Sequence, residues 1–333
     1  MERFAEAGGN FIDTANHYAG GESERILGEL VAPNREHWVI ATKYGLNARP
    51  GDPNGGGAHR KSLARSLDES LKRLGTDYVD LYWVHIWDAF TPVEEVVCAL
   101  DEQVRAGKIL YVGVSDTPAW NVSRAVTLAE ERGMERFNAL QVPYSLVERT
   151  VERDLLPMAR ALDLAVTTWA PLGGGLLTGR YGTGRARPEG TRLAGIGGRH
   201  EENATSGRNL AIADAVNAVA AERGVSATQV AIAWVLAQRR RRGVVIPIVG
   251  ARTASHSSAT TSGRWTSSCR RTTSRAWRRP AGSSSASPTT SGGPGWPTAR
   301  PSTSSTTTTA WCTPSCERRQ PTTRTASRKG AKR

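Results

Sequence analysis

Short apolar segments alternate with amphipathic helical segments as far as residue 250, and this alternation limits the possible folds more than any other feature of the chain. Hydrophobic patterning predicts strands at residues 10–13, 37–43, 78–85, 110–115, 139–142, 164–169 and 244–249. It predicts helices at residues 23–30, 60–74, 93–106, 119–131, 151–161, 210–223 and 227–238, and a long loop ending near residue 206. Regular strand–helix alternation indicates βαβ units and therefore a parallel sheet.

Two folds contain such a sheet, an open doubly wound sheet and a closed (β/α)8 TIM barrel. No G-x-G-x-x-G motif follows the first predicted strand, which weakens the doubly wound alternative. We therefore predict an α/β fold of the barrel type, although the sequence supplies one strand fewer than a barrel needs. Because residues 1–7 resemble the end of a helix, we expect about 30–50 residues, roughly one βα unit and a cap, to be missing before Met1.

The composition changes abruptly near residue 254. Residues 1–254 hold 30 Lys/Arg and 30 Asp/Glu, whereas residues 255–333 hold 14 Lys/Arg and a single acid. The second segment has no Leu, Ile, Val, Met, Phe or Tyr, and 34 of its 79 residues are Ser or Thr. Because it cannot bury enough apolar surface to offset its ordering entropy, we predict a barrel at 1–254 and a disordered basic tail at 255–333. The net charge of +13 lies wholly in this tail, so nucleic-acid binding is only a minor alternative.

Other features of the sequence concern the location of the protein. No segment approaches the roughly 20 apolar residues that span a membrane. The N-terminus lacks the basic start and apolar core of a signal peptide. Cys98 lies in an apolar helical segment and is predicted as a core thiol, so nothing indicates a disulfide framework. We expect a cytoplasmic protein without a metal site.

Three predicted strands end in titratable side chains, Asp13, Lys43 and His85, and Tyr18 lies in the loop after the first strand. The carboxyl ends of parallel barrel strands lie side by side, so these residues are expected to converge at one mouth of the barrel. A phenol is a poor acid at neutral pH, but a neighbouring ammonium group stabilises the phenolate, and a carboxylate holds that ammonium in place. A neutral imidazole can orient a carbonyl group. Each residue alone is weak evidence, but together they predict protonation of a carbonyl oxygen while hydride reaches the carbon.

Several longer motifs share this order along the chain. They are Phe11-Ile12-Asp13-Thr14-Ala15-x-x-Tyr18, Ala41-Thr42-Lys43, residues 73–81 before His85, Gly113-Val114-Ser115, Gln141-Val142-Pro143-Tyr144, residues 169–179 and residues 246–252. Over residues 1 to about 253 the chain thus resembles the aldo/keto reductase superfamily. The resemblance implies a TIM barrel that binds NADPH or NADP+ without a Rossmann domain. Its catalytic tetrad would be Asp13, Tyr18, Lys43 and His85.

By the same resemblance, residues at later strand ends would hold the nicotinamide. Ser115, Asp116 and Gln141 would contact its carboxamide, although asparagine is commoner than aspartate at the position of Asp116. Trp169 would stack on the nicotinamide ring.

The remainder of the cofactor would lie along two further turns. Leu172, Gly173 and Leu176 would line the pyrophosphate. Gly250 belongs to the turn after the last strand, in which the guanidinium of Arg252 would meet the adenosine 2′-phosphate.

The resemblance ends near residue 254, and we interpret the segment beyond that point as an out-of-frame translation. Residues 255–291 can be written in GC-rich codons, with the third bases and some Ser and Arg codons chosen, so that a shift of one frame gives an amphipathic, charge-balanced sequence similar to the family's C-terminal continuation. In the family this segment supplies contacts to adenine and a last helix that packs on the barrel. The chain as written is therefore expected to lack both strand 1 and the C-terminal helix.

The leading hypothesis is an NADPH-dependent oxidoreductase that reduces an aldehyde or ketone to an alcohol, with Tyr18 as proton donor. The loop after His85, which contains Trp87 and Phe90, resembles members that act on aryl or medium-sized aldehydes. The alternative is an inactive or non-catalytic cofactor-binding or regulatory barrel, because both chain ends are expected to be defective.

Overall fold

The computed structural model describes residues 1–250 except 187, 197 and 240–242. All of them belong to the first of two units into which the chain divides, residues 1–279. Arg252 and the predicted tail at 255–333 lie outside the described residues, so the predicted domain boundary stays a prediction.

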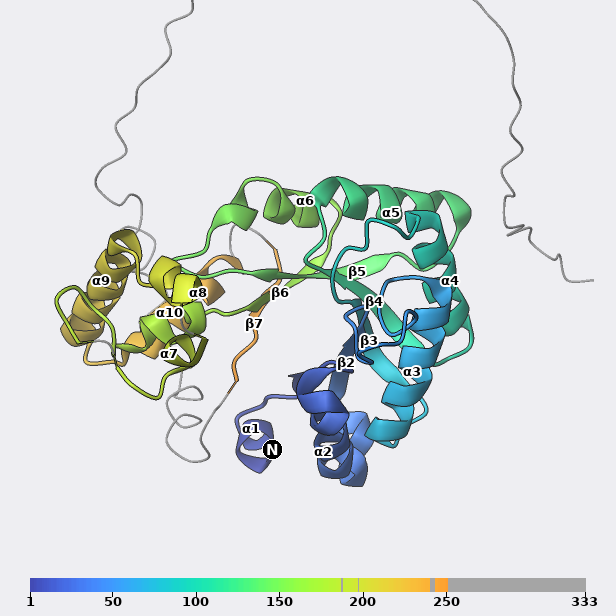
Figure 1. The fold of residues 1–333 in the computed structure, drawn as a ribbon, viewed down its shortest axis with the longest axis horizontal. Coiled ribbons are helices and arrows are strands. Elements are labelled where there is room, and N and C mark those ends of the chain that lie inside the picture. Colours follow the sequence, from blue (N-terminus) through green and yellow to red (C-terminus); the bar gives the residue numbers. More distant parts are fainter. Residues whose placement is uncertain (187, 197, 240–242, 251–333) are drawn as a thin grey trace, which may run out of the picture. The chain divides into compact units, whose positions relative to one another are not determined.

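Seven parallel strands form one sheet in chain order (Figure 1). They are β1 (Phe11–Asp13), β2 (Val39–Tyr44), β3 (Val79–Val84), β4 (Ile109–Ser115), β5 (Phe137–Pro143), β6 (Ala165–Trp169) and β7 (Val245–Pro247). A doubly wound sheet would reverse its strand order, so this sequential order excludes that alternative. The sheet curls as in a (β/α)8 barrel that lacks one strand among the described residues, which confirms the predicted fold class.

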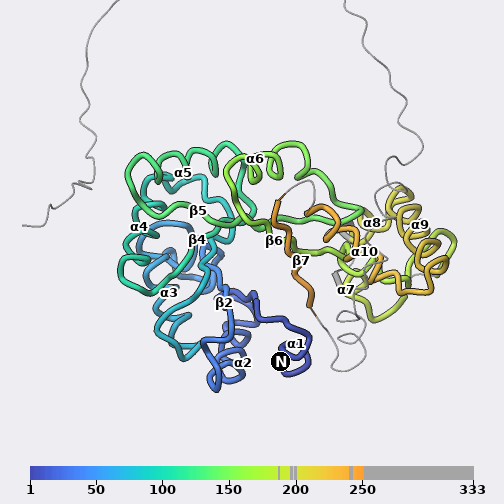
Figure 2. Tube along the Cα trace, turned by 180° about the vertical axis from the view of Figure 1, so that it is seen from behind, coloured from blue at the N-terminus to red at the C-terminus, as the bar shows by residue number. Residues whose placement is uncertain are grey.

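Helices cover the outer side of the curled sheet, as both views show (Figures 1 and 2). The longer ones are α2 (Glu22–Val31), α3 (Arg60–Leu74), α4 (Val93–Arg105), α5 (Ala119–Arg132), α9 (Gly207–Arg223) and α10 (Ala227–Ala237). The shorter helices are α1 (Glu2–Glu6), α6 (Leu155–Ala161), α7 (Arg192–Ile196) and α8 (Gly198–Ala204), and the 3-10 turns are η1 (Tyr18–Gly21), η2 (Ala32–His37), η3 (Thr150–Glu152) and η4 (Gly173–Thr178). No helix in the described part of the chain is both long and apolar enough to cross a membrane.

The predicted loop before residue 206 is wrong in part, because it contains α7 and α8. At the start of α7 the Thr191 hydroxyl accepts a hydrogen bond from the Ala194 amide at 3.2 Å, which caps the helix. Leu193 is buried beside Gly174, where an added Cβ would lie 3.0 Å from the leucine. A cap and one buried contact are thus enough to form a short helix in a Gly- and Arg-rich stretch.

The two faces of the sheet have different surroundings because strand side chains alternate between faces. The outward set packs under the helices and includes Ile40, Tyr82, Val84, Val112, Leu140 and Val166. The inward set forms a separate small cluster of Ala41, Leu81, Trp83 and Ala139 with Phe11 and Ala165 packed against it. Trp83 is fully buried there, and a Cβ on Gly113 would lie 2.4 Å from its ring, so the indole needs a glycine at that position.

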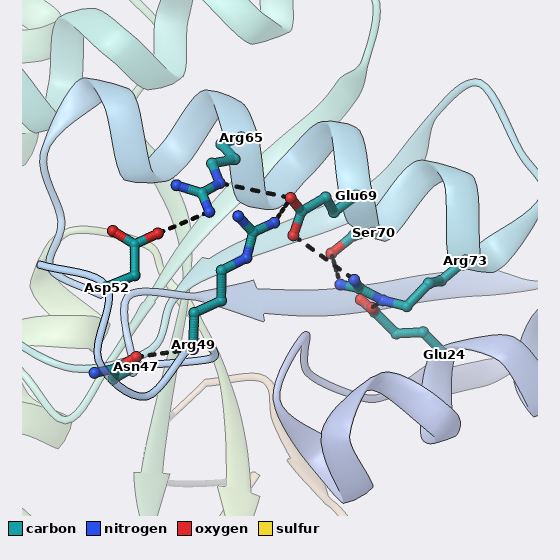
Figure 3. A network of polar contacts seen from close by, with 8 residues as sticks. All are labelled: Glu24, Asn47, Arg49, Asp52, Arg65, Glu69, Ser70 and Arg73. Carbon is teal, nitrogen blue, oxygen red and sulfur yellow. Dashed lines mark hydrogen bonds and ion pairs between the residues drawn. The ribbon is translucent and has the colours of Figure 1, made fainter. Parts of the chain in front are cut away.

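The β2–α3 loop is tied to the surface of α3 by ion pairs (Figure 3). Arg65 pairs with Asp52 at 2.8 Å and with Glu69 at 3.6 Å. Glu69 also pairs with Arg49 in the loop and with Arg73 on α3. These contacts fix a long Gly-rich loop close to the carboxyl end of β2.

Candidate active site

Alternation along the strands carries the predicted site residues to one layer inside the curled sheet. Those at the ends of β1 to β5 lie two positions beyond a residue on the inner face of the sheet, so their side chains point to the same face. The pairs are Phe11 and Asp13, Ala41 and Lys43, Trp83 and His85, Gly113 and Ser115, and Ala139 and Gln141. His85 follows the last residue of β3, and its amide continues the strand pairing by donating to the Tyr44 carbonyl at 2.9 Å. The strand-end side chains therefore meet above a floor of packed apolar groups, as the sequence predicts.

Lys43 is the centre of the polar contacts in this layer. Its side chain is 0% exposed, and the Nζ group donates to the carboxylate of Asp13, which is itself only 6% exposed. The same ammonium donates to the Thr14 carbonyl at 2.8 Å and lies 3.5 Å from the Tyr18 hydroxyl. Gln141 donates from Nε2 to the other Asp13 oxygen at 3.1 Å. The structure therefore brings Asp13, Tyr18 and Lys43 together, with Gln141 as a fourth member.

Tyr18 reaches this cluster from the turn η1 rather than from a strand. Ala19 and Gly20, which follow it, have φ values of 50° and 65°, so the chain turns back in the left-handed region immediately after the phenol. The Tyr18 side chain stays 38% exposed while the Lys43 ammonium lies 5.0 Å from its ring centroid. The phenol thus lies between the buried ammonium and solvent, with the His17 and His85 rings against it.

A second buried carboxylate supports β2 beside Lys43. Glu24 is 0% exposed and accepts hydrogen bonds from the Thr42 hydroxyl at 2.5 Å and from Arg73 Nε at 2.6 Å. These contacts join α2, β2 and α3 at the position adjacent to Lys43. This role of Glu24 was not predicted from the sequence, because its partners lie 18 and 49 residues away along the chain.

His85 faces Tyr18 and a further imidazole, that of His17. The ring centroids of His85 and Tyr18 are 6.0 Å apart, and those of His85 and His17 are 5.0 Å apart. Burial, the Lys43 ammonium and the neighbouring His17 lower the pKa of His85 to about 3. Burial and Lys43 also lower the pKa of His17, although the Glu24 carboxylate opposes this shift. Both imidazoles are therefore neutral at physiological pH. His17 was not predicted as a site residue, although it lies directly before Tyr18 in the chain.

The residues predicted to hold a nicotinamide lie at the ends of β4, β5 and β6. Ser115 is buried and is paired in register with Gln141. Trp169 is 38% exposed and donates from Nε1 to the Asp116 carboxylate at 3.4 Å. Burial raises the pKa of Asp116, against the hydrogen bond from Trp169 and the charge of Lys43. Asp116 has a φ of 41°, a conformation that aspartate and asparagine adopt more readily than most residues.

The remaining predicted cofactor residues lie on the turns after β6 and β7. Gly173 has a φ of 57° and begins η4, and a Cβ there would lie 2.8 Å from Val147. Leu176 is fully buried in the main core, so only its backbone can face a ligand, and Leu172 packs partly against the same core. Gly250 follows β7, whose extension is held by a 2.8 Å hydrogen bond from Ile248 to Thr168. Within the described residues, no hydrogen bond joins this group to the predicted tetrad.

Exposed aromatic side chains lie on the loops at the same end of the sheet. Trp87, after β3, contacts Trp120, at the start of α5, edge to face with centroids 5.8 Å apart. Phe90 in the same loop is 96% exposed. Trp120 was not among the sequence predictions, although its position just after the end of β4 places it on this rim.

Comparisons with known proteins show which sequences this chain resembles. The model of the aldo/keto reductase family matches residues 1–262. A norsolorinic acid reductase of Emericella nidulans is 41% identical over 261 residues, which are 76% of this chain and 64% of that protein. The aldo-keto reductase ausK of Aspergillus calidoustus is 38% identical over 77% of this chain and 65% of its own length. A probable aryl-alcohol dehydrogenase of Saccharomyces cerevisiae is 37% identical over 77% of this chain and 79% of its own length. The chain thus spans slightly less than two thirds of the first two relatives.

Proposed function

The chain belongs to the aldo/keto reductase family, and on this premise we propose that it reduces an aldehyde or ketone to the alcohol, with NADPH as hydride donor and Tyr18 as proton donor. The observation that carries the proposal is the buried Lys43 ammonium, which donates to the Asp13 carboxylate and lies 3.5 Å from the Tyr18 hydroxyl. A lysine in this position serves a phenol that must give up its proton.

In the proposed reaction the substrate carbonyl oxygen lies beside the Tyr18 hydroxyl and the His85 ring. The phenol transfers its proton to that oxygen as hydride reaches the carbonyl carbon, so the product is a neutral alcohol. The Lys43 ammonium stabilises the phenolate left on Tyr18, and Asp13 and the Thr14 carbonyl hold the ammonium in place. Neutral His85 can donate one hydrogen bond to the carbonyl oxygen without competing with Tyr18 for the role of acid.

The residues after β4 and β6 suit a nicotinamide cofactor, which would supply the hydride. The Trp169 ring is partly exposed beside Asp116 and can cover a flat heterocycle. Gly173, Gly174 and Gly175 have φ values of 57°, 67° and 109°. Such a run leaves the turn without side chains, so its backbone can approach a pyrophosphate closely, while the Gly173 and Gly175 amides hold the turn by donating to the Ala170 and Leu172 carbonyls. Ser115, Asp116 and Gln141 would hold the carboxamide, and Leu172, Gly173, Leu176 and Gly250 the phosphate side. The preference for NADPH over NADH is assigned to Arg252, outside the described residues.

The aromatic rim favours an aryl carbonyl compound as substrate. Trp87, Trp120 and Phe90 present exposed ring surface at the mouth of the site. Aromatic rings stack or pack edge to face with one another, so an aryl aldehyde would gain contact area on this rim. The name of the yeast relative, aryl-alcohol dehydrogenase, agrees with such a substrate.

The proposed location of the protein is the cytoplasm.

One pair of measurements tests the proposal. NADPH fluorescence on titration with the full chain measures cofactor binding, and NADPH oxidation with 4-methoxybenzaldehyde measures turnover. We expect Tyr18→Phe to bind NADPH as the wild type does and to lose turnover by at least about 10²-fold, because the proton donor is gone. Retained turnover in this variant would refute the role of Tyr18. Binding without turnover in the wild type would instead favour a non-catalytic cofactor-binding barrel.

A further inference from the structure

The His17 imidazole lies in the site but has no task in the reaction described above. Its centroid is 4.8 Å from that of Tyr18 and 5.0 Å from that of His85. The Tyr18 and His85 centroids are 6.0 Å apart, so the three rings form a triangle in which the proposed proton donor, Tyr18, is one corner. His17 is therefore placed to contact a substrate that binds to Tyr18 and His85.

The buried nitrogen atoms of the two histidines determine which edge of each ring can donate. In both His17 and His85, Nδ1 is fully buried and has no hydrogen-bond partner among the described residues. Neither Nε2 atom is both buried and without a partner, so each ring keeps its Nε2 edge available to a ligand. A buried N–H without an acceptor costs more free energy than an unpaired lone pair. Because both rings are neutral and carry one proton each, we assign that proton to Nε2 in both.

We propose that His17 is a second hydrogen-bond donor to the substrate, and that the site favours carbonyl compounds with a second oxygen acceptor adjacent to the reacting carbonyl. This inference rests on the proposed reduction at Tyr18 and specifies its substrate class. The His85 Nε2–H donates to the reacting oxygen, and the His17 Nε2–H, one ring contact away, donates to the neighbouring oxygen. The aromatic rim indicates an aryl frame, so an ortho-oxygenated aryl aldehyde combines both features.

The substrate preference expected from this arrangement is moderate. A hydrogen bond between neutral groups in a partly open site changes kcat/KM by up to about ten-fold. A substrate of the same shape without the second oxygen leaves the His17 donor unpaired and loses this factor.

Three aldehydes and two variants test the proposal on the full chain. The probe is 2-methoxybenzaldehyde, 2-ethylbenzaldehyde has nearly the same shape without the second oxygen, and 4-methoxybenzaldehyde carries that oxygen out of reach. We expect the wild type to prefer the 2-methoxy over the 2-ethyl compound by about ten-fold in kcat/KM. His17→Phe keeps a ring in the triangle and should bring that ratio to about one, whatever its effect on the turnover of each aldehyde taken alone. His37→Phe is the matched control, because His37 contacts Trp38 away from the site and should leave the ratio unchanged.

The outcomes separate this inference from the function on which it rests. A wild-type ratio near one, or an unchanged ratio in His17→Phe, overturns the role of His17 while the reductase activity stands. If His17→Phe does not fold, the wild-type ratio for the two ortho-substituted aldehydes alone decides the question. Failure of the wild type to reduce any of the three aldehydes overturns the proposed function, and this inference with it.

Discussion

Two polar networks include residues of β2, α3 and the loop between them, and they differ in how far their side chains are exposed to water. In the inner network Lys43 is 0% exposed and Asp13 is 6% exposed, and the ammonium also contacts the Thr14 carbonyl and the Tyr18 hydroxyl. In the outer network of Figure 3, Arg49, Asp52, Arg65 and Glu69 pair with side chains that are 28% to 36% exposed. The charged groups are of the same kind, but those of the inner network are removed from solvent. In Figure 3 this holds for Glu24 as well, which Arg73 joins to Glu69.

This difference in burial assigns different tasks to the two networks. Charges attract more strongly in a medium of low effective dielectric, but removing them from water has a large cost. The inner pair offsets that cost with further hydrogen bonds from the ammonium and to the carboxylate. It holds a positive charge beside the Tyr18 hydroxyl, where the proposed reaction would move a proton. The outer pairs are screened by water and do little more than hold a loop against a helix. Four predictions, in order of expected effect, test this division.

Replacing Lys43 should have the largest effect. Lys43→Met removes the charge that would stabilise the Tyr18 phenolate, so we expect turnover to fall by about 10²–10⁴-fold. Stopped-flow oxidation of NADPH with 4-methoxybenzaldehyde measures the loss, and circular dichroism checks that the variant is folded. Lys72→Met, at an exposed position of α3, is the matched control and should stay within about two-fold of the wild type. Equal activity of the two variants would contradict the role of Lys43.

Removing Glu24 should have the second-largest effect, a loss in the free energy of unfolding. Glu24 is fully buried between Thr42 and Arg73, and Arg73 is only 17% exposed. Glu24→Ala leaves this guanidinium with only the longer, 3.9 Å pair to Glu69, so we expect the free energy of unfolding to fall by about 3 kcal/mol. Urea denaturation measures it, with Glu29→Ala on the exposed face of α2 as control. A double variant that also carries Arg73→Gln should recover part of the loss, and no recovery would show that the charge is not the cause.

The fold and the centre of the inner network could be predicted from the sequence because both depend on short-range patterns. Period-two alternation and strand–helix spacing indicate a parallel sheet, and the strand-end rule brings Asp13, Lys43 and His85 to one layer. The supports of that layer could not be predicted in the same way. The partners of Glu24 are set by how α2 packs on α3, and the contact of His17 with His85 spans two loops. The helix α7 was missed because its formation depends on the burial of Leu193, a tertiary contact that composition does not reveal.

The pH dependence of stability should report the lowered pKa of His85 in the inner site. His85 has a folded pKa of about 3, whereas an unfolded histidine has a pKa near 6.5. Between these values the unfolded state binds more protons, so the free energy of unfolding falls as the pH falls below about 6.5. The limiting slope for one such group is about 1.4 kcal/mol per pH unit, and partial exposure of the ring reduces it.

Urea denaturation at several pH values between 7 and 4 measures this slope. We expect it to be shallower in His85→Gln than in the wild type, since glutamine does not titrate. Equal slopes in the wild type and His85→Gln would show that His85 titrates normally in the folded state.

Breaking the outer network should have the smallest effect. Arg65→Ala removes the contacts to Asp52 and Glu69, and we expect a loss of about 0.2–1 kcal/mol in the free energy of unfolding. The difference from the wild type should shrink in about 1 M salt, where the Debye length is about 3 Å, whereas the loss in Glu24→Ala should persist because water and ions do not reach that carboxylate. Turnover should stay within about two-fold of the wild type, because no member of this network contacts the Lys43 ammonium. A loss in Arg65→Ala that equals the loss in Glu24→Ala, and resists salt, would mean that burial does not determine how much these ion pairs stabilise the fold.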